Sequence, residues 1–147
     1  MKRKFWLAMM LAAPFTAKPK EITRLKQRYA GVAWFREGGR ALTHEYDANR
    51  NWQTTTLVDV DKRGTAARVL WDLSSDELYA DPGNPEYDRL PNGAWVLREE
   101  DGALFLNGMG ATPQGNRPFL DRYTIKDGST RRLFRSDAAS YEVFVGF

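Results

Sequence analysis

A strand, loop and hairpin pattern in residues 104–134 constrains the fold more than any other part of the chain. It starts with a short apolar run that leads into a glycine-rich loop, and a second apolar segment begins at Phe119. The polar residues 126–129 then have the composition of a tight turn, which is followed by apolar residues from Leu133. Short apolar runs separated by glycine-containing turns are typical of antiparallel sheets, so the sequence predicts an all-β fold.

The same pattern occurs earlier in the chain, which indicates a repeated unit. Residues 54–60 lead through a charged, glycine-containing turn into the apolar run 67–71. Aligning Leu70 with Leu133 gives an offset of 63 residues, the difference of their numbers. A β-propeller blade is typically about 40 to 50 residues long, so an insertion is needed. The polar, turn-rich stretch 74–85 provides it.

We therefore predict an all-β partial β-propeller, with about two four-stranded antiparallel blades and the start of a third. The expected segments are a basic lead-in with a signal-like apolar run at 1–28, a first blade at 29–71, an insertion at 72–85, a second blade at 86–135 and the start of the next blade at 136–147. The expected strands of the first blade are 29–35, 41–46, 52–59 and 67–71. Those of the second blade are 94–99, 103–107, 119–125 and 130–134, and an apolar strand at 141–145 would open the third.

One continuous stretch resembles a known family. Residues 90–123, with 81–85 before them and 130–142 after them, resemble the propeller region of the prolyl oligopeptidase family of serine peptidases, and its glutamyl endopeptidase branch in particular. The resemblance extends from about residue 13 to residue 147, and its most distinctive part is GMGATPQGNRPFL at 108–120. It implies a longer protein, in which the propeller is followed by an α/β-hydrolase domain with a Ser-Asp-His triad. It also implies that this longer protein hydrolyses peptides and uses the propeller to gate substrate access.

The sequence predicts no catalytic residue in this chain. It has no G-x-S-x-G motif, the strained turn that presents the serine of an α/β-hydrolase. A serine nucleophile also needs a general base. The single histidine, His44, lies in the alternating stretch 41–46, which favours a structural or exposed strand residue. The resemblance puts the family's catalytic histidine near the distant C-terminus. We therefore expect the chain to be inactive alone, and the sequence assigns no substrate-binding residues.

Two motif-like segments do not meet the requirements of a cofactor or metal site. Residues 108–113 begin like a dinucleotide fingerprint, but Pro113 stands where the third glycine belongs and no periodic helix follows. Residues 59–64 begin like a calcium loop, but Arg63 and Leu70 stand where the third ligand and the bidentate glutamate are needed. Cysteine is absent, which excludes thiolate zinc sites and disulfides. We expect no cofactor and no metal, and we expect the glycines of the first segment to permit positive φ angles.

Tryptophans offer two readings. Four of them lie in or beside expected strands, and they could line a ligand-binding surface or pack between neighbouring blades. Packing is the usual role of large rings in strands, and we favour it here. The four residues are Trp34, Trp52, Trp71 and Trp95.

Charge argues against a nucleic-acid partner. The net charge is +3 and the pI is about 9.3. Residues 1–28 hold 8 of the 22 basic residues and one of the 19 acidic ones, so residues 29–147 hold 14 basic and 18 acidic residues, a net charge of −4. A folded nucleic-acid-binding domain should carry its basic patch on the domain itself. The one local basic cluster, Arg131, Arg132 and Arg135, is explained by a solvated strand face.

The first residues leave the compartment open. Basic residues at 2–4 and the apolar run 5–13 imitate a secretory signal peptide. No good cleavage site follows, the run is too short to span a bilayer, and a chance imitation within an internal segment is the favoured alternative. The absence of cysteine fits a bacterial protein in any compartment. A cytoplasmic and a periplasmic or secreted location both remain open.

Two functional readings follow. The favoured one is a non-catalytic propeller segment, which meets peptide substrates through the α/β-hydrolase domain and can self-associate through uncovered blade faces. The end of the chain within an apolar run suggests a truncated protein. The alternative is a free-standing exported β-domain that binds a protein or a glycan, in keeping with the signal-like N-terminus and the tryptophans.

Overall fold

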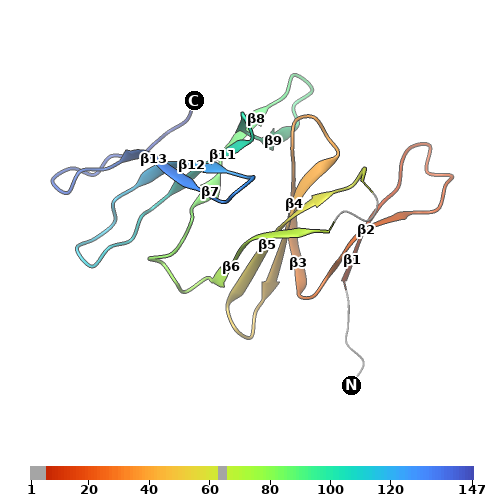
Figure 1. Ribbon diagram of the computed structural model, residues 1–147, viewed down its shortest axis with the longest axis horizontal. Helices are drawn as coiled ribbons and strands as arrows, with labels where there is room; N and C mark the ends of the chain where they lie inside the picture. The colour runs from red at the N-terminus through yellow and green to blue at the C-terminus, as the bar shows by residue number, and fades with distance from the viewer. Residues whose placement is uncertain (1–5, 63–65) are drawn as a thin grey trace. The chain divides into compact units, whose positions relative to one another are not determined.

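The computed structural model describes residues 6–62 and 66–147, and every helix or strand in these ranges is a β-strand (Figure 1). The strands pair in antiparallel fashion, and no sheet among the described strands closes into a barrel. The prediction of an all-β fold with antiparallel sheets is confirmed. The chain divides into two compact units, Met1–Ser74 and Ser75–Phe147. Across the described ranges there is no helix with the length and apolarity that a bilayer crossing requires.

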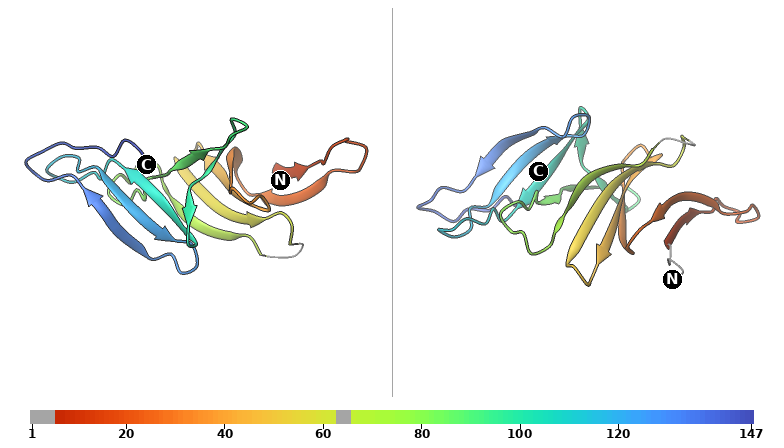
Figure 2. Two further views of the ribbon diagram at one scale, coloured as in Figure 1. Left: turned by 90° about the horizontal axis from the view of Figure 1, so that it is seen from above. Right: turned by 60° about the horizontal axis from the view of Figure 1, so that its bottom comes forward.

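A four-stranded antiparallel sheet forms most of the N-terminal unit. Its strands follow one another in chain order and are β3 (Arg28–Trp34), β4 (Arg40–Asp47), β5 (Trp52–Asp59) and β6 (Arg68–Ser74). Each strand expected between residues 29 and 71 has a counterpart here. Figure 2 shows the four strands side by side with the twist that is usual for such sheets. Four antiparallel strands in chain order are the architecture of one propeller blade.

The two central strands of this sheet supply its core. Leu42 on β4 is fully buried and Val58 on β5 is nearly so. The carboxylate of Glu45, also buried, accepts hydrogen bonds from the backbone N–H groups of Lys26 and Gln27, both at 2.7 Å. A buried carboxylate is stable only with such partners, because desolvation penalises its charge. Glu45 therefore ties the turn before β3 to the sheet.

The basic lead-in contains regular structure that the sequence analysis did not predict. β1 (Trp6–Met10) pairs with β2 (Lys20–Leu25) as an antiparallel hairpin. β2 falls within residues 18–28, for which the sequence analysis gave a basic lead-in and no strand. The strand forms because the apolar β1 provides a pairing partner, and Leu25 of β2 is buried. The basic residues 2–4 lie outside the described residues.

The C-terminal unit contains a second antiparallel sheet and a small separate hairpin. The main sheet has the order β10 (Glu99–Glu100), β11 (Ala103–Gly108), β12 (Phe119–Thr124) and β13 (Thr130–Arg135), and the short β7 (Asn84–Pro85) also pairs with β11. The hairpin consists of β8 (Tyr87–Arg89) and β9 (Trp95–Leu97). The core of this unit includes Leu97, Leu104 and Leu106, each at most 1% exposed. These buried leucines explain the apolar runs of the sequence.

The strand expected at 94–99 is divided in the structure. β9 ends at Leu97 and β10 begins at Glu99, with Arg98 between them. The Arg98 N–H donates a hydrogen bond to the carbonyl of Glu86, and its guanidinium forms ion pairs with Asp88 at 2.9 Å and Glu100 at 2.6 Å. One expected strand is therefore two short strands that belong to different sheets.

Two further expectations need correction. Residues 141–145 are not a strand, because no described strand pairs with them, and the N–H of Glu142 donates instead to the Ser136 hydroxyl at 3.0 Å. The insertion 72–85 is shorter than expected, because β6 continues to Ser74 and β7 pairs with β11. In both places the pairing of the backbone, and not the apolar pattern, decides what is strand.

Candidate functional site

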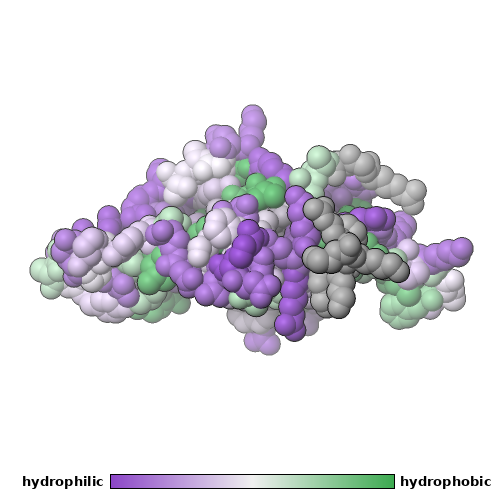
Figure 3. Space-filling model, turned by 90° about the horizontal axis from the view of Figure 1, so that it is seen from below, coloured by the Kyte–Doolittle hydropathy of each residue, from purple (hydrophilic) through white to green (hydrophobic). Residues whose placement is uncertain are grey.

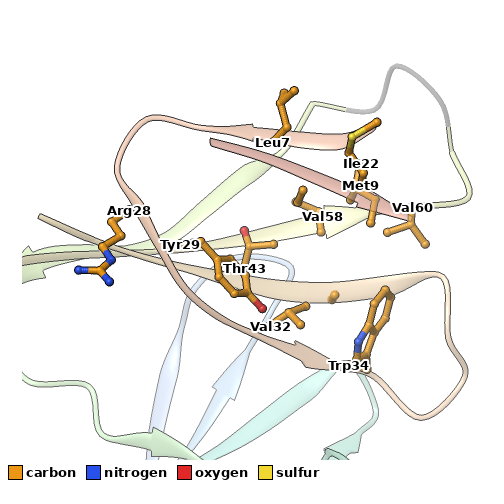
Figure 4. A pocket seen from close by; sticks show the side chains of 12 residues that line it. Leu7, Met9, Ile22, Arg28, Tyr29, Val32, Trp34, Thr43, Val58 and Val60 are labelled. Carbon is orange, nitrogen blue, oxygen red and sulfur yellow. The ribbon is translucent and has the colours of Figure 1, made fainter. Parts of the chain in front are cut away.

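An open, mainly apolar hollow of about 480 Å³ lies between the β1–β2 hairpin and strands β3 to β5. We call it the apolar groove. In Figure 4, the side chains of Leu7, Met9 and Ile22 lie above those of Tyr29, Val32 and Trp34, with Val58 and Val60 between the two groups. Four of these side chains are 41–52% exposed, namely Leu7, Met9, Tyr29 and Val32. Apolar surface of this kind favours contact with another apolar group over contact with water.

Polar groups are few in the apolar groove. Thr43 is buried, and its hydroxyl donates to the carbonyl of Thr56 at 3.3 Å. Among the described residues that line the groove, Arg28 is the one charged side chain. Its guanidinium points away from the apolar side chains in Figure 4. The groove therefore offers apolar contact with a cation at one end, and its lining includes no nucleophile paired with a base.

His44 lies in the middle of β4 and contacts the neighbouring strand. Its Nδ1 is 3.0 Å from the hydroxyl of Thr55, its direct cross-strand neighbour on β5. Burial lowers the pKa of His44 from its ordinary value, since desolvation disfavours the charged imidazolium. A base in a triad is oriented by a third group, usually a carboxylate. The contact that the structure gives His44 is that of a cross-strand pair in a sheet.

The lowered pKa of His44 predicts a pH-dependent stability. As the pH falls below about 6.5, the unfolded chain binds a proton at His44 before the folded chain does. The free energy of unfolding is therefore highest above about pH 7, and it decreases as the pH falls toward the lower pKa that His44 has in the folded state. Urea unfolding at about pH 7, 6 and 5 should show this loss in the N-terminal unit.

His44→Gln provides the control for this prediction. Glutamine can keep a hydrogen bond to Thr55 but does not titrate, so the loss between about pH 7 and pH 5 should disappear. Hydrogen bonds that their carboxylates accept lower the pKa values of Asp47, Asp59 and Asp72. Protonation of these carboxylates therefore changes the stability at a more acidic pH than protonation of His44 does. An equal loss in His44→Gln would show that another group is responsible.

The four tryptophans lie in different local environments. Trp34 lines the apolar groove and Trp71 is half-buried on β6. The indole N–H of Trp52 donates to Asp72 at 2.6 Å, and this hydrogen bond is the main reason for the lowered pKa of Asp72. Trp95 belongs to the C-terminal unit and is 62% exposed. The expected core role is therefore wrong for Trp95, which lies on a short hairpin.

The glycine-rich loop after β11 is a closely packed connection. Gly110 has φ +58°, as expected for a glycine that permits positive φ. Gly108 does not have a positive φ, and it is needed because its backbone lies against the ring of Phe119. The N–H of Arg117 donates to the carbonyl of Gly110 at 2.9 Å and closes the loop. Within the described residues, the segment that follows Pro113 is loop and strand, so no helix N-terminus lies beside these glycines.

In the described part of the segment that resembles a calcium loop, residues 59–62, the backbone bends after β5. The carboxylate of Asp59 accepts hydrogen bonds from the N–H groups of Asp61 and Lys62, at 3.1 Å and 3.0 Å. Arg63, one of the residues that argue against calcium, lies outside the described residues. In the described part of the chain, no three His, Asp or Glu side chains lie close enough together to hold a metal ion.

Sequence reasoning missed a buried serine and an ion-pair centre in the C-terminal unit. Ser136 is fully buried, and its hydroxyl donates to the carbonyl of Ser140 at 2.8 Å and accepts from Glu142. A buried hydroxyl engaged in this way anchors the loop after β13. Arg98 lies with its guanidinium 3.9 Å from the ring centre of Phe147, in addition to its ion pairs. Neither residue stands out in the sequence, because the burial of Ser136 and the contact of Arg98 with Phe147 arise only in the folded chain.

The arginine cluster on β13 is partly paired. Arg132 forms a two-pronged ion pair with Asp121 on β12, and Asp121 is only 5% exposed. Arg131 and Arg135 are exposed. A solvated strand face therefore describes two of the three arginines, and the third stabilises a buried carboxylate.

Together these features define an all-β protein with blade-like antiparallel sheets and an apolar groove. The chain is 38% identical over 129 residues to a protein of Oryza sativa subsp. japonica named "Probable glutamyl endopeptidase, chloroplastic". It is 33% identical over 140 residues to a protein of the same name from Arabidopsis thaliana. The alignments cover 84% and 90% of this chain and 14% of each relative, so the chain spans about one seventh of their length. No family model and no solved structure matches the chain.

The relatives support the resemblance at a coarse level. The chain corresponds to a small part of two proteins that are named as probable glutamyl endopeptidases. The glutamyl endopeptidase name predicted from the sequence is the name that both relatives carry. A bacterial source stays a prediction, since both relatives are plant proteins.

Proposed function

We propose that this chain is part of the non-catalytic β-propeller of a serine peptidase of the prolyl oligopeptidase family, in its glutamyl endopeptidase branch. One observation carries the proposal: most of the chain aligns with about one seventh of two proteins that are named as glutamyl endopeptidases. Its four-stranded meander, β3 to β6, supports the assignment to a propeller blade. In this proposal the catalytic serine, aspartate and histidine belong to another domain.

The proposed role of the segment is to restrict which peptides reach that catalytic domain. A propeller is a rigid ring of blades, so a narrow opening through it admits short, flexible peptides and excludes folded chains. The segment would contribute to this selection through the shape of its blades, and hydrolysis itself would proceed through an acyl-enzyme intermediate on the missing domain.

A graft into the rice relative tests this role. Three proteins are compared: the intact rice protein, one that lacks the aligned segment, and one that carries the aligned residues of this chain in its place. Each is given a short glutamyl peptide and the same sequence within a long folded polypeptide. We expect the deletion to raise cleavage of the long substrate relative to the short one, and the graft to restore the selectivity. The gating role is contradicted if the graft cleaves the short peptide but cleaves the long substrate, relative to the short one, as readily as the deletion protein does.

The purified 147-residue chain should hydrolyse neither substrate. Turnover by the chain alone that a single serine replacement abolishes would show that it is an enzyme in its own right.

A further inference from the structure

The C-terminal unit displays an apolar segment that resembles a strand without a partner. Residues 141–145, which we call the C-terminal strip, expose four of their five side chains. Tyr141, Val143 and Val145 are 62%, 51% and 94% exposed, whereas Phe144 is half-buried. The strip therefore presents a row of apolar side chains to water.

The backbone of the strip is also unpaired. No backbone-to-backbone hydrogen bond joins residues 141–147 to another described residue. The strip is nevertheless held in place at its end, since the ring of Phe147 contacts those of Phe105 and Phe144 at centroid distances of 4.9 Å and 5.0 Å. The Glu142 N–H is bonded to the Ser136 hydroxyl, and the other backbone groups of this anchored strip can add to a sheet edge.

The N-terminal unit has an edge that fits such a strip. Leu7, Ala8 and Met9 of β1 all border the apolar groove, but only Ile22 of β2 does. Successive strand residues normally point to opposite faces, and a register irregularity between Ala8 and Met9 lets three residues in a row border the hollow. β1 pairs with β2 alone, which leaves its other edge unpaired among the described strands. The apolar groove therefore combines a free backbone edge with an apolar floor.

The charges near the C-terminal strip and near the apolar groove also favour contact between the two. Residues 18–28, which include β2, hold five basic residues and one acidic residue, and Arg28 lies at one end of the groove. Residues 136–147 hold Asp137 and Glu142 and no basic residue. Opposite net charges on the two surfaces promote their encounter and disfavour contacts between like surfaces.

The face drawn in Figure 3 offers no comparable surface in its coloured part. Hydrophilic residues (purple) predominate there, and apolar residues (green) form separate patches. Scattered apolar side chains are normal on a protein surface, whereas an apolar groove beside a strand edge is not.

We propose that the C-terminal strip of one copy of this chain binds in the apolar groove of a second copy. The strip pairs with the free edge of β1 by backbone hydrogen bonds, and its outward side chains cover Val32 and Trp34. Because strip and groove are different surfaces, the contact is head-to-tail and each bound copy still offers one of each. Association is therefore open-ended and rises with protein concentration. This inference goes beyond the proposed function and does not rest on it.

Two complementary variants test the proposal. The double variant Val143→Lys/Val145→Lys disables the strip, and Val32→Glu disables the groove. Each change is made at an exposed side chain, which limits its effect on folding. Sedimentation velocity over a range of concentrations should show oligomers for the unmodified chain. In each variant, association should weaken by roughly 30-fold or more, the effect of losing a central interface contact.

The mixture of the two variants gives the decisive result. The groove of the strip variant and the strip of the groove variant are both intact, so an equimolar mixture should form one-to-one dimers and nothing larger. Val69→Lys, a change at a valine on β6 that is 53% exposed and outside the groove, should associate like the unmodified chain. A mixture that stays monomeric, or variants that associate as strongly as the unmodified chain, would overturn the proposal.

A peptide competition covers the case in which Val32→Glu does not fold. A synthetic peptide with the sequence of residues 139–147 should dissociate oligomers of the unmodified chain, and a peptide with lysine at positions 143 and 145 should not. Equal effects of the two peptides, or a monomeric unmodified chain at every concentration, would contradict a strip-in-groove contact.

Discussion

Replacement of Gly110 by alanine should lower the free energy of unfolding of the C-terminal unit by about 2 to 5 kcal/mol. Gly110 has φ +58°, a left-handed conformation that costs an L-residue about 1 to 2 kcal/mol. An added Cβ would also overlap the carbonyl oxygen of Arg117 and lie 3.0 Å from the ring of Phe119. The Arg117 N–H is bonded to the Gly110 carbonyl, so this backbone cannot move without opening the loop. Relief of such an overlap costs roughly another 1 to 3 kcal/mol.

Gly102→Ala is the matched control. Gly102 has a similar φ of +70°, but no atom lies within 4 Å of the position that its Cβ would take. Gly102→Ala should therefore lower the free energy of unfolding only by the cost of the left-handed backbone conformation, about 1 to 2 kcal/mol. Hydrogen exchange of the amides in β11 and β12 reports on the C-terminal unit separately from the rest of the chain. Equal losses of protection in the two variants would show that the loop relaxes around the alanine at position 110.

Arg132→Met should destabilise the same unit by about 2 to 4 kcal/mol, because it leaves a buried charge without its partner. Both carboxylate oxygens of Asp121 accept hydrogen bonds from the Arg132 guanidinium, Oδ2 at 3.0 Å, and Asp121 is 5% exposed. The side chain of Arg132 is itself 43% exposed, so water replaces part of the lost interaction and the effect stays below that of a fully buried pair.

Two comparisons separate the buried charge from a general effect of losing an arginine. Arg131→Met removes an exposed neighbour on the same strand and should change the unfolding free energy by less than about 0.5 kcal/mol. The double variant Asp121→Leu/Arg132→Met removes both charges and should be more stable than Arg132→Met alone. Hydrogen exchange of β12 and β13 is again the measurement. A double variant that is less stable than Arg132→Met would mean that the ion pair is not the reason for the loss.

The strands of the first sheet were predictable because their sequence shows strong local patterns. Residues 41–46 combine apolar and polar side chains, residues 52–59 are rich in β-branched side chains, and these are the positions of β4 and β5. β2 was missed, because Lys20, Glu21 and Arg24 make its sequence polar. Its strand character comes from pairing with β1, and pairing partners are not visible in local sequence.

The end of the chain shows the opposite error. Residues 141–145 have a clear strand pattern, yet in the structure they are an unpaired strip. An apolar alternation states a preference for an extended conformation, but a strand exists only where another strand accepts its hydrogen bonds. The proposed binding of a second copy would supply that partner.

The apolar groove itself could not be predicted. Its floor and sides come from residues as distant as Leu7 and Val60, and each of them belongs to a segment with an ordinary strand pattern. The role of Arg132 was not visible either, since its partner Asp121 lies on another strand. The exposure of Trp95 was not predictable for the same reason, because the exposure of a side chain depends on neighbours that approach it only in the folded chain.

The sequence by itself determined that this protein is all-β, with short antiparallel strands and glycine turns, since these depend on residue types a few positions apart. It also determined the resemblance to glutamyl endopeptidases, and two plant relatives of the chain carry that name. Only the tertiary structure decided which strands pair, where the apolar groove lies and which arginine neutralises a buried aspartate. Those features depend on contacts between distant residues, and such contacts exist only after the chain has folded.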